Sequence, residues 1–148
     1  MKNKQYEPEV EAALGMWVKL ARAFAVFNKR TSEHIRHHGL TASQFGALEC
    51  LGHLGPMTIG GLSKKMLVSG GNMTVVIDNL EKENLVERVR DKSDRRAVHV
   101  QLTKKGRRVF NKVFPEHAEY VTKLVSVLSP EEQEALAGLL KKLGLAIQ

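Results

Sequence analysis

Residues 58–102 decide the fold of this chain: TIGGLSKKMLVSGGNMTVVIDNLEKENLVERVRDKSDRRAVHVQL. Thr58 can cap a short helix, because an N-cap hydroxyl accepts a backbone N–H of the first turn. The apolar residues of that helix share one face: Ile59, Leu62 and Met66. Leu67–Val68 interrupts the spacing, and Ser69 can cap a second helix. Its inward residues are Met73, Val76, Ile77 and Leu80. This pattern predicts a helix-turn-helix.

Two strands with a polar tip follow the second helix. Asn84 stands where a helix stop is expected, and asparagine tolerates the left-handed backbone of such stops. Residues 85–90 and 97–102 are predicted strands, the second with strict alternation of apolar and polar side chains. Between them lie six polar residues, Asp91 to Arg96. The pattern predicts a basic hairpin, or wing, beside the helix-turn-helix.

This arrangement favours contact with DNA. The second helix of such a motif places its N-terminal side chains in the major groove. Here these residues are small or hydrogen-bonding: Ser69, Gly70, Gly71, Asn72 and Thr74. The wing arginines, Arg95 and Arg96, can enter a narrow minor groove, where the negative potential is enhanced. Lys92 lies in the same tip and is a further candidate for DNA contact. Lys64 and Lys65 are expected to touch phosphates at most.

The charge distribution points to the same partner. The 148 residues carry a net charge of +7. Residues 85–108 hold nine Lys or Arg against three acids, a local charge of +6. A basic patch on one element is typical of proteins that bind nucleic acids. Double-stranded DNA is therefore the predicted partner.

Other classes of protein have little support in the sequence. The single cysteine allows no intramolecular disulfide and no cysteine zinc cluster. No apolar run approaches the ~18 residues of a membrane span, and the N-terminus has no apolar signal core. We therefore expect a cytoplasmic protein with no membrane partner. No phosphate loop or nucleophile–base set is present, so we expect no enzyme activity, no cofactor and no resident metal.

Both ends of the chain predict helices that need a partner. A first helix begins at Pro8, runs to about His38 and is ended by Gly39. A last helix begins at Ser129-Pro130-Glu131-Glu132. Both carry apolar residues three and four apart, as at a helix–helix interface: Val10, Leu14 and Trp17 in the first, and Leu136, Leu140, Leu143 and Ile147 in the last.

These helices predict a homodimer with two recognition helices about one DNA turn, ~34 Å, apart. The expected fold class is mainly α with a small β-hairpin wing. We expect a single domain, 1–148, with a winged helix-turn-helix at about 41–108 and dimerisation helices at about 8–38 and 109–148.

Two further helices of this domain have start signals. Thr41-Ala42-Ser43-Gln44 is a capping box for one helix, and Thr103 caps the other, in which Pro115 predicts a kink or a restart.

Several motifs together resemble the MarR family of bacterial transcription regulators over nearly the whole chain. The most specific part runs from Leu62 to Gly106. It contains LSKK at 62–65, SGGNMT at 69–74, VIDNLEKENLV at 76–86, DRR at 94–96 and LTKKG at 102–106. The joint occurrence of the last two motifs at this spacing is highly specific. One departure is Asn84, where the family usually has glycine.

The resemblance implies roles for particular residues. Residues 69–83 would be the recognition helix, Arg96 would enter the minor groove, and Arg95 would lie near the backbone. Asp94 would hold the wing arginine by a salt bridge. The family binds DNA as a homodimer. Many members release DNA when a phenolic or other small aromatic ligand binds where the dimer and DNA-binding parts meet. The sequence is accordingly interpreted as a repressor of this type that binds an inverted-repeat operator.

Four alternatives stay open at this point. His34, His37 and His38 have a spacing that could support a metal site, although a polar helix end is favoured. Cys50 could be a redox sensor, although a structural thiol is favoured. Trp17 and Phe24 could line a ligand pocket rather than a dimer core. The winged helix could also bind protein instead of DNA, which would predict no dependence on the wing.

Overall fold

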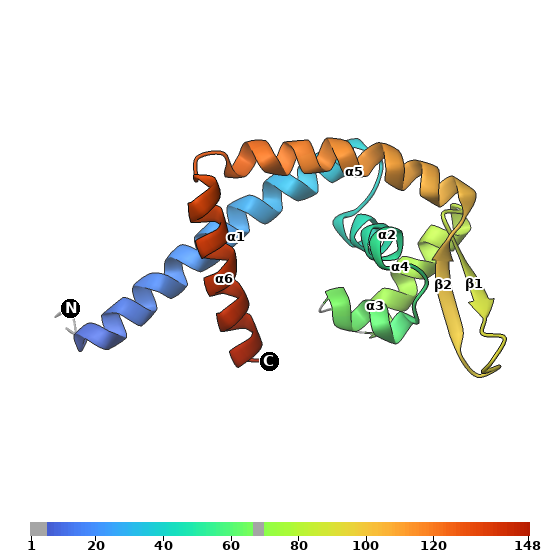
Figure 1. Ribbon diagram of the computed structural model, residues 1–148, viewed down its shortest axis with the longest axis horizontal. Helices are drawn as coiled ribbons and strands as arrows, with labels where there is room; N and C mark the ends of the chain where they lie inside the picture. Colours follow the sequence, from blue (N-terminus) through green and yellow to red (C-terminus); the bar gives the residue numbers. More distant parts are fainter. Residues whose placement is uncertain (1–5, 67–69) are drawn as a thin grey trace.

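The computed structural model of the protein describes residues 6–66 and 70–148. Its elements follow one another as α1 (Pro8–His37), α2 (Ala42–Leu54), α3 (Ile59–Met66), α4 (Gly70–Lys82), β1 (Val86–Arg90), β2 (Val98–Leu102), α5 (Lys104–Val125) and α6 (Pro130–Ala146). Helices α2 to α4 and the hairpin gather at one side, and α6 crosses α1 at the other (Figure 1). The predicted fold class, mainly α with one hairpin, is confirmed.

Side-chain caps begin the helices where the sequence predicts them. Thr41 and Gln44 exchange both bonds of a capping box at α2. Ser129 and Glu132 do the same at α6, with Pro130 in the first turn. The hydroxyl groups of Thr58 and Thr103 accept backbone N–H bonds from Gly61 and Gly106, both at 3.0 Å. The predicted Ser69 cap and the Leu67–Val68 break lie outside the described residues.

The core lies under the helix-turn-helix. Most predicted inward residues are buried in it, and Val76 is only partly buried against it. The fully buried large side chains are Ile35, Leu48, Leu51, Leu62, Met73, Ile77, Leu80, Val86 and Val100. Ile35 is the one described residue of α1 that is buried. The core therefore ends where α1 and α5 leave the winged part.

The hairpin is anchored at its base and extends beyond the core. β1 and β2 pair antiparallel from Val86↔Leu102 to Arg90↔Val98, so each strand begins one residue later than predicted. Val100 also exchanges two backbone hydrogen bonds with Met57, which lies between α2 and α3. Val100 is fully buried whereas Val98 is 38% exposed, because Val98 lies toward the tip where no helix covers the sheet.

Two backbone features agree with the predictions made from the sequence, and a third agrees only in part. Asn84 has φ of 59°, the left-handed conformation expected at the stop after α4. Gly39 has φ of 77° and follows α1. Helix α5 runs through Pro115 as one uninterrupted helix that curves along its length (Figure 1), so the alternative of a restarted helix is wrong.

The terminal helices expose large apolar side chains. No residue of α6 is buried, and in α1 Trp17 and Phe24 are 60% and 67% exposed. The N-terminal half of α1 and the whole of α6 lie apart from the winged part (Figure 1). None of the described helices is both long and apolar enough to span a membrane.

Candidate nucleic-acid interface

Helix α4 presents a polar and small-residue face to solvent. Met73, Ile77 and Leu80 bury one side of it in the core. The exposed side begins at the N-terminal end of the helix with Gly71, Asn72 and Thr74. Gly70 is the first residue of α4, and Ser69 lies outside the described residues. The predicted major-groove residues that the structure describes thus lie at one end of α4.

Val75 joins this face, and sequence reasoning missed it. Its side chain is 58% exposed although its neighbour Val76 packs against the core. An exposed apolar side chain beside hydrogen-bonding ones suits the C5-methyl group of thymine. The signal was present in the sequence, since Val75 falls off the inward spacing of Met73 and Ile77.

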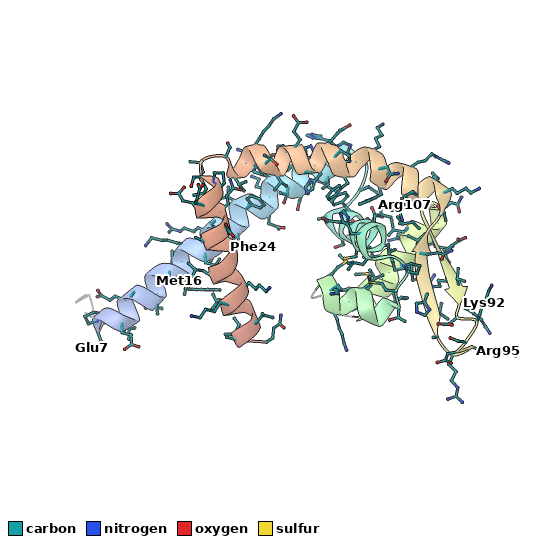
Figure 2. The ribbon with its side chains drawn as sticks, viewed as in Figure 1. Glu7, Met16, Phe24, Lys92, Arg95 and Arg107 are labelled. Carbon is teal, nitrogen blue, oxygen red and sulfur yellow. The ribbon has the colours of Figure 1, made fainter. Side chains whose placement is uncertain are left out.

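The hairpin tip presents cations. Lys92, Arg95 and Arg96 are all exposed. The labelled side chains of Lys92 and Arg95 extend from the tip, away from the helices (Figure 2). Asp91 shapes the turn by accepting from the N–H and the hydroxyl of Ser93, at 2.8 and 2.7 Å. These two bonds, above all that of the Ser93 hydroxyl, lower the pKa of Asp91.

Asp94 does not make the predicted salt bridge. Its carboxylate accepts the backbone N–H of Arg96 at 3.0 Å instead. An aspartate in a tight turn readily bonds a backbone N–H two residues on, and this local contact orders the tip. In the part of the chain that the structure describes, neither Arg95 nor Arg96 forms an ion pair. Their charges face solvent.

Four other basic residues around the winged part have different surroundings. Lys105 donates to the Glu83 carbonyl at 2.9 Å, and Arg107 donates to the Gly52 carbonyl at 3.0 Å. These two cations therefore donate to backbone carbonyls near the C-terminal ends of α4 and α2. Lys64 and Lys65 are exposed in the last turn of α3, as expected for phosphate contacts.

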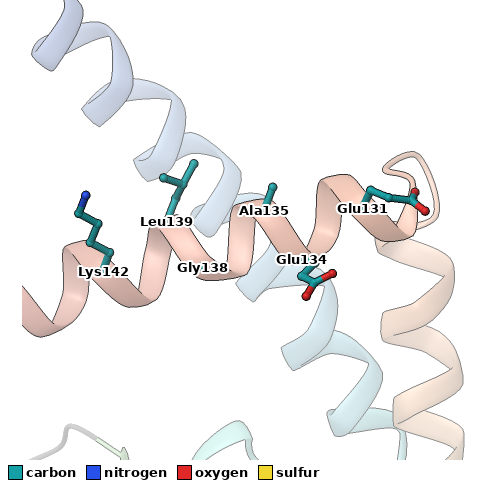
Figure 3. Close-up of a pocket in the computed structure, with 6 residues that line it drawn as sticks. All are labelled: Glu131, Glu134, Ala135, Gly138, Leu139 and Lys142. Carbon is teal, nitrogen blue, oxygen red and sulfur yellow. The ribbon is translucent and has the colours of Figure 1, made fainter.

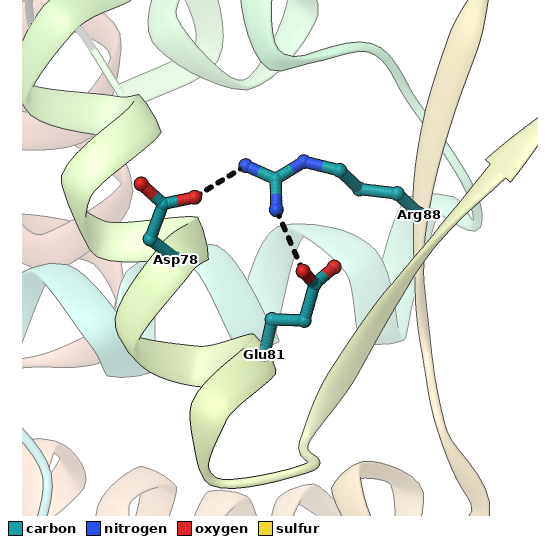
Figure 4. Close-up of polar contacts among 3 residues, drawn as sticks. All are labelled: Asp78, Glu81 and Arg88. Atoms are coloured by element: carbon teal, nitrogen blue, oxygen red, sulfur yellow. Dashed lines mark hydrogen bonds and ion pairs between the residues drawn. The ribbon is translucent and has the colours of Figure 1, made fainter.

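Arg88 lies between the wing and the recognition helix. Its guanidinium donates to Asp78 at 2.6 Å and to Glu81 at 3.0 Å, both from α4 (Figure 4). The bond to Asp78 is the main cause that raises the pKa of Arg88. Sequence reasoning counted Arg88 only as part of the basic patch, because the contact becomes visible once strand and helix are placed.

A small cleft lies between α1, α2 and α5. It has a volume of about 140 Å³. Its lining residues come from all three helices: Asn28, Thr31, Ser32, Ile35, Ala42, Phe45, Gly46, Glu49 and His117. Trp17 and Phe24, considered from the sequence as pocket residues, do not line it. No local motif marks the cleft, because its residues are brought together from three helices.

Histidines gather beside this cleft in a different set from the one considered in the sequence. His34 and His117 approach with their Nδ1 atoms 3.4 Å apart, and His34 stacks on Tyr120. His38 contacts Glu116 at 3.4 Å, whereas His37 is exposed. Burial is the main cause that lowers the pKa of both His34 and His117. The described residues contain no group of three or more ligands that could hold a metal, so His34, His37 and His38 form no such site there.

Cys50 is half-buried and packs against the core. Burial raises the pKa of its thiol, and Glu49 adds to the effect. A raised pKa disfavours the thiolate that a reactive cysteine requires. The structure therefore favours the structural interpretation of Cys50.

The predicted dimer residues lie on exposed faces. Val10, Leu14, Trp17, Leu136, Leu140 and Ile147 are exposed, and Leu143 is half-buried. A shallow, open surface follows one face of α6 beside them (Figure 3). Its lining residues are Glu131, Glu134, Ala135, Gly138, Leu139 and Lys142. The surface is apolar along its middle and charged at both ends.

These features define a class: a winged helix-turn-helix protein with an exposed recognition helix, a basic wing and uncovered terminal helices. The model of the MarR family matches residues 40–98. The HTH-type transcriptional regulator MhqR of Bacillus subtilis is 37% identical over 135 residues, 91% of this chain and 93% of MhqR. The chain belongs to the MarR family of DNA-binding transcriptional regulators.

Two solved structures connect the fold to DNA and to a ligand. A mutant of Escherichia coli MarR in complex with operator DNA is 26% identical, with a TM-score of 0.74 over 86% of this chain and 95% of that one. Bordetella bronchiseptica BpsR, whose DNA binding is regulated by 6-hydroxynicotinic acid, is 27% identical. Its TM-score is 0.72 over 85% of this chain and 98% of that one.

Proposed function

We propose that the protein is a homodimeric repressor that binds an inverted-repeat operator and releases it when a small aromatic ligand binds. The observation that carries this proposal is the division of the molecule. The exposed face of α4 and the exposed wing arginines lie at one side, and the uncovered apolar faces of α1 and α6 lie at the other (Figure 1). Each side needs a partner of different chemistry.

A second copy is the partner that suits the terminal helices. Apolar residues on both α1 and α6 face solvent, and an isolated protein rarely exposes so continuous an apolar surface. A closed two-fold interface would cover these faces in both copies at once. The same symmetry would repeat α4 and the wing, so that two half-sites are contacted together.

The experiment that tests the proposal is an anisotropy titration of two labelled fragments at several salt concentrations. One fragment comes from directly upstream of the protein's own gene, and the other is its scrambled counterpart. We expect salt-dependent binding that prefers the native fragment by ~10³ or more. Equal binding to both fragments would contradict specific regulation at that promoter. Binding to neither would favour a winged helix that contacts protein.

Arg96→Ala is expected to weaken operator binding about 10-fold to 100-fold, because it removes a cation proposed to enter the minor groove. The melting temperature and the dimer should be unchanged, since the Arg96 side chain is exposed. Anisotropy and sedimentation measure the two properties separately.

Arg36→Ala is the matched control for Arg96→Ala. It removes the same charge from the last turn of α1, far from the hairpin tip (Figure 1). An equal loss of affinity in both variants would mean that net charge alone, and not the wing, supports binding.

The cleft between α1, α2 and α5 is the proposed ligand site. Its volume of about 140 Å³ suits one aromatic ring, since a cavity of ~150 Å³ holds benzene. Glu49 lines it, and no lysine or arginine lines it among the described residues. We therefore infer an uncharged phenolic ligand rather than an aromatic carboxylate. A ring between these helices would change the angle between the dimer part and the winged part.

Phenol and 4-hydroxybenzoate test this preference on the preformed operator complex. We expect phenol to release DNA at a concentration at least about tenfold lower, because a carboxylate beside Glu49 is repelled. Glu49→Gln should narrow that difference while leaving operator affinity unchanged. A wild-type preference for 4-hydroxybenzoate would contradict the assignment of ligand class.

A further inference from the structure

Helix α4 and the hairpin are joined by a short turn. The chain turns between them within Glu83, Asn84 and Leu85, where Leu85 donates its N–H to the carbonyl of Leu80. Val86, the first residue of β1, is fully buried. Past the Arg88↔Val100 pair the hairpin leaves the core, and the direction of its tip relative to α4 depends on further contacts made at that level.

Arg88 makes such a contact. It is the next residue after Val86 on the inner face of β1, and it pairs across the hairpin with Val100. Val100 is fully buried and hydrogen-bonded to Met57, so this pair marks the last level at which the sheet is held by the core. From there the guanidinium reaches two carboxylates three residues apart on α4, Asp78 and Glu81 (Figure 4).

The geometry points to Arg88 as a positioning residue that fixes the angle between the wing and the recognition helix through Asp78 and Glu81. This inference rests on the proposed function, in which α4 and the wing contact the same DNA. A planar guanidinium that donates to two separate acceptors constrains direction as well as distance, which a lysine cannot do. This two-acceptor contact, the fork, also offsets one of the two negative charges that Asp78 and Glu81 place on α4.

The three side chains are partly exposed, Arg88 by 28%, Asp78 by 49% and Glu81 by 43%. Exposed ion pairs contribute little to stability in water. Loss of the fork should therefore shift the melting temperature by less than about 3 °C. Its effect should be visible in DNA binding, where a displaced wing misses its groove.

Arg88→Lys gives the first test in the full-length protein. It keeps the charge and removes the fork, and we expect operator affinity to fall about tenfold. Lys123→Gln is the matched control, because it breaks another exposed ion pair, with Glu119 at 3.0 Å on α5, and should leave affinity unchanged. Wild-type affinity in Arg88→Lys would overturn the positioning role while leaving the proposed function intact.

The double variant Asp78→Asn/Glu81→Gln separates positioning from direct phosphate contact by the sign of its effect. If Arg88 acts through the two acids, removing them weakens binding about tenfold although the recognition helix has lost two negative charges. If Arg88 instead binds phosphate, the same variant frees its guanidinium and tightens binding. The tighter complex would overturn the inference.

Coupling to the wing completes the test. In an Arg88→Gln background, Arg96→Ala should cost clearly less affinity than it does in the wild type, because the wing is already misplaced. Equal costs in both backgrounds would overturn the inference. Failure of the wild type itself to prefer its operator would overturn the proposed function, and the inference with it.

Discussion

Leu140→Asp is expected to separate the dimer into monomers. Leu140 is 41% exposed on the apolar face of α6, and a two-fold interface would bury it twice. Burying an unpaired carboxylate costs several kcal/mol, so the dimer should dissociate at a concentration at least ~100-fold higher than the wild type. Sedimentation velocity across a concentration series measures this change directly.

DNA affinity should fall with the dimer. A monomer can contact one half-site only, and loss of the second contact typically costs a factor of ~10² to 10⁴. The melting transition of the winged part should persist, because no residue of α6 is buried in the chain. A mutant that binds the operator like the wild type would contradict the role of α6 in a functional dimer.

Leu54→Asp is the matched control for this prediction. It makes the same exchange at a leucine that is 58% exposed, at the end of α2 and outside both terminal helices. The wild-type oligomeric state is expected. Dissociation in both variants would mean that added negative charge, rather than the α6 face, controls assembly.

Gly106→Ala is expected to destabilise the fold strongly. A Cβ at Gly106 would overlap the carbonyl oxygen of Leu85, and that oxygen also accepts the backbone N–H of Thr103. The obstacle is backbone, which cannot rotate away as a flexible side chain could. We expect a loss of about 3 kcal/mol, the upper end for overpacking, and a melting temperature lowered by about 6–12 °C. Calorimetry measures both.

Gly60→Ala is the control for the glycine exchange. Gly60 also lies in the first turn of a helix, α3, but a Cβ there meets nothing closer than the Thr58 hydroxyl at 3.9 Å. Alanine is the better helix former by about 1 kcal/mol, so stability should stay constant or rise. Wild-type stability in Gly106→Ala would mean that α5 can move away from the turn before β1.

The two halves of the molecule depend on different physics. The winged part has its own apolar core, whereas α1 and α6 complete theirs by covering one another in a second copy under the proposed function. The proposed ligand cleft lies where α1 and α5 meet α2, between these halves. A ligand there needs only a small change of helix angle to alter the distance between two recognition helices.

Local features of the fold could be predicted because their causes lie a few residues apart. The caps at Thr41, Thr103 and Ser129 each join a side chain to an N–H three residues on. The left-handed Asn84 and the alternation around Val100 are equally local. The exposed positions of α4 that the structure describes follow from the helical spacing of its apolar residues. The cations of the wing follow from the run of polar residues between the two predicted strands.

Tertiary structure decided the contacts that join distant segments. His34 meets His117 and Arg107 meets Gly52, pairs that no spacing rule relates. Asp94 was expected to bond an arginine side chain, but the tight turn offered a nearer backbone N–H.

Arg88 is an arginine in the basic segment 85–108, and by its residue type it could bind DNA. The packing of β1 on α4 instead directs its side chain to Asp78 and Glu81. The physical reason is common to these cases. The sequence by itself determines local structure in which the interacting groups lie only a few residues apart along the chain. A charged side chain with several candidate partners contacts the one that the fold brings nearest.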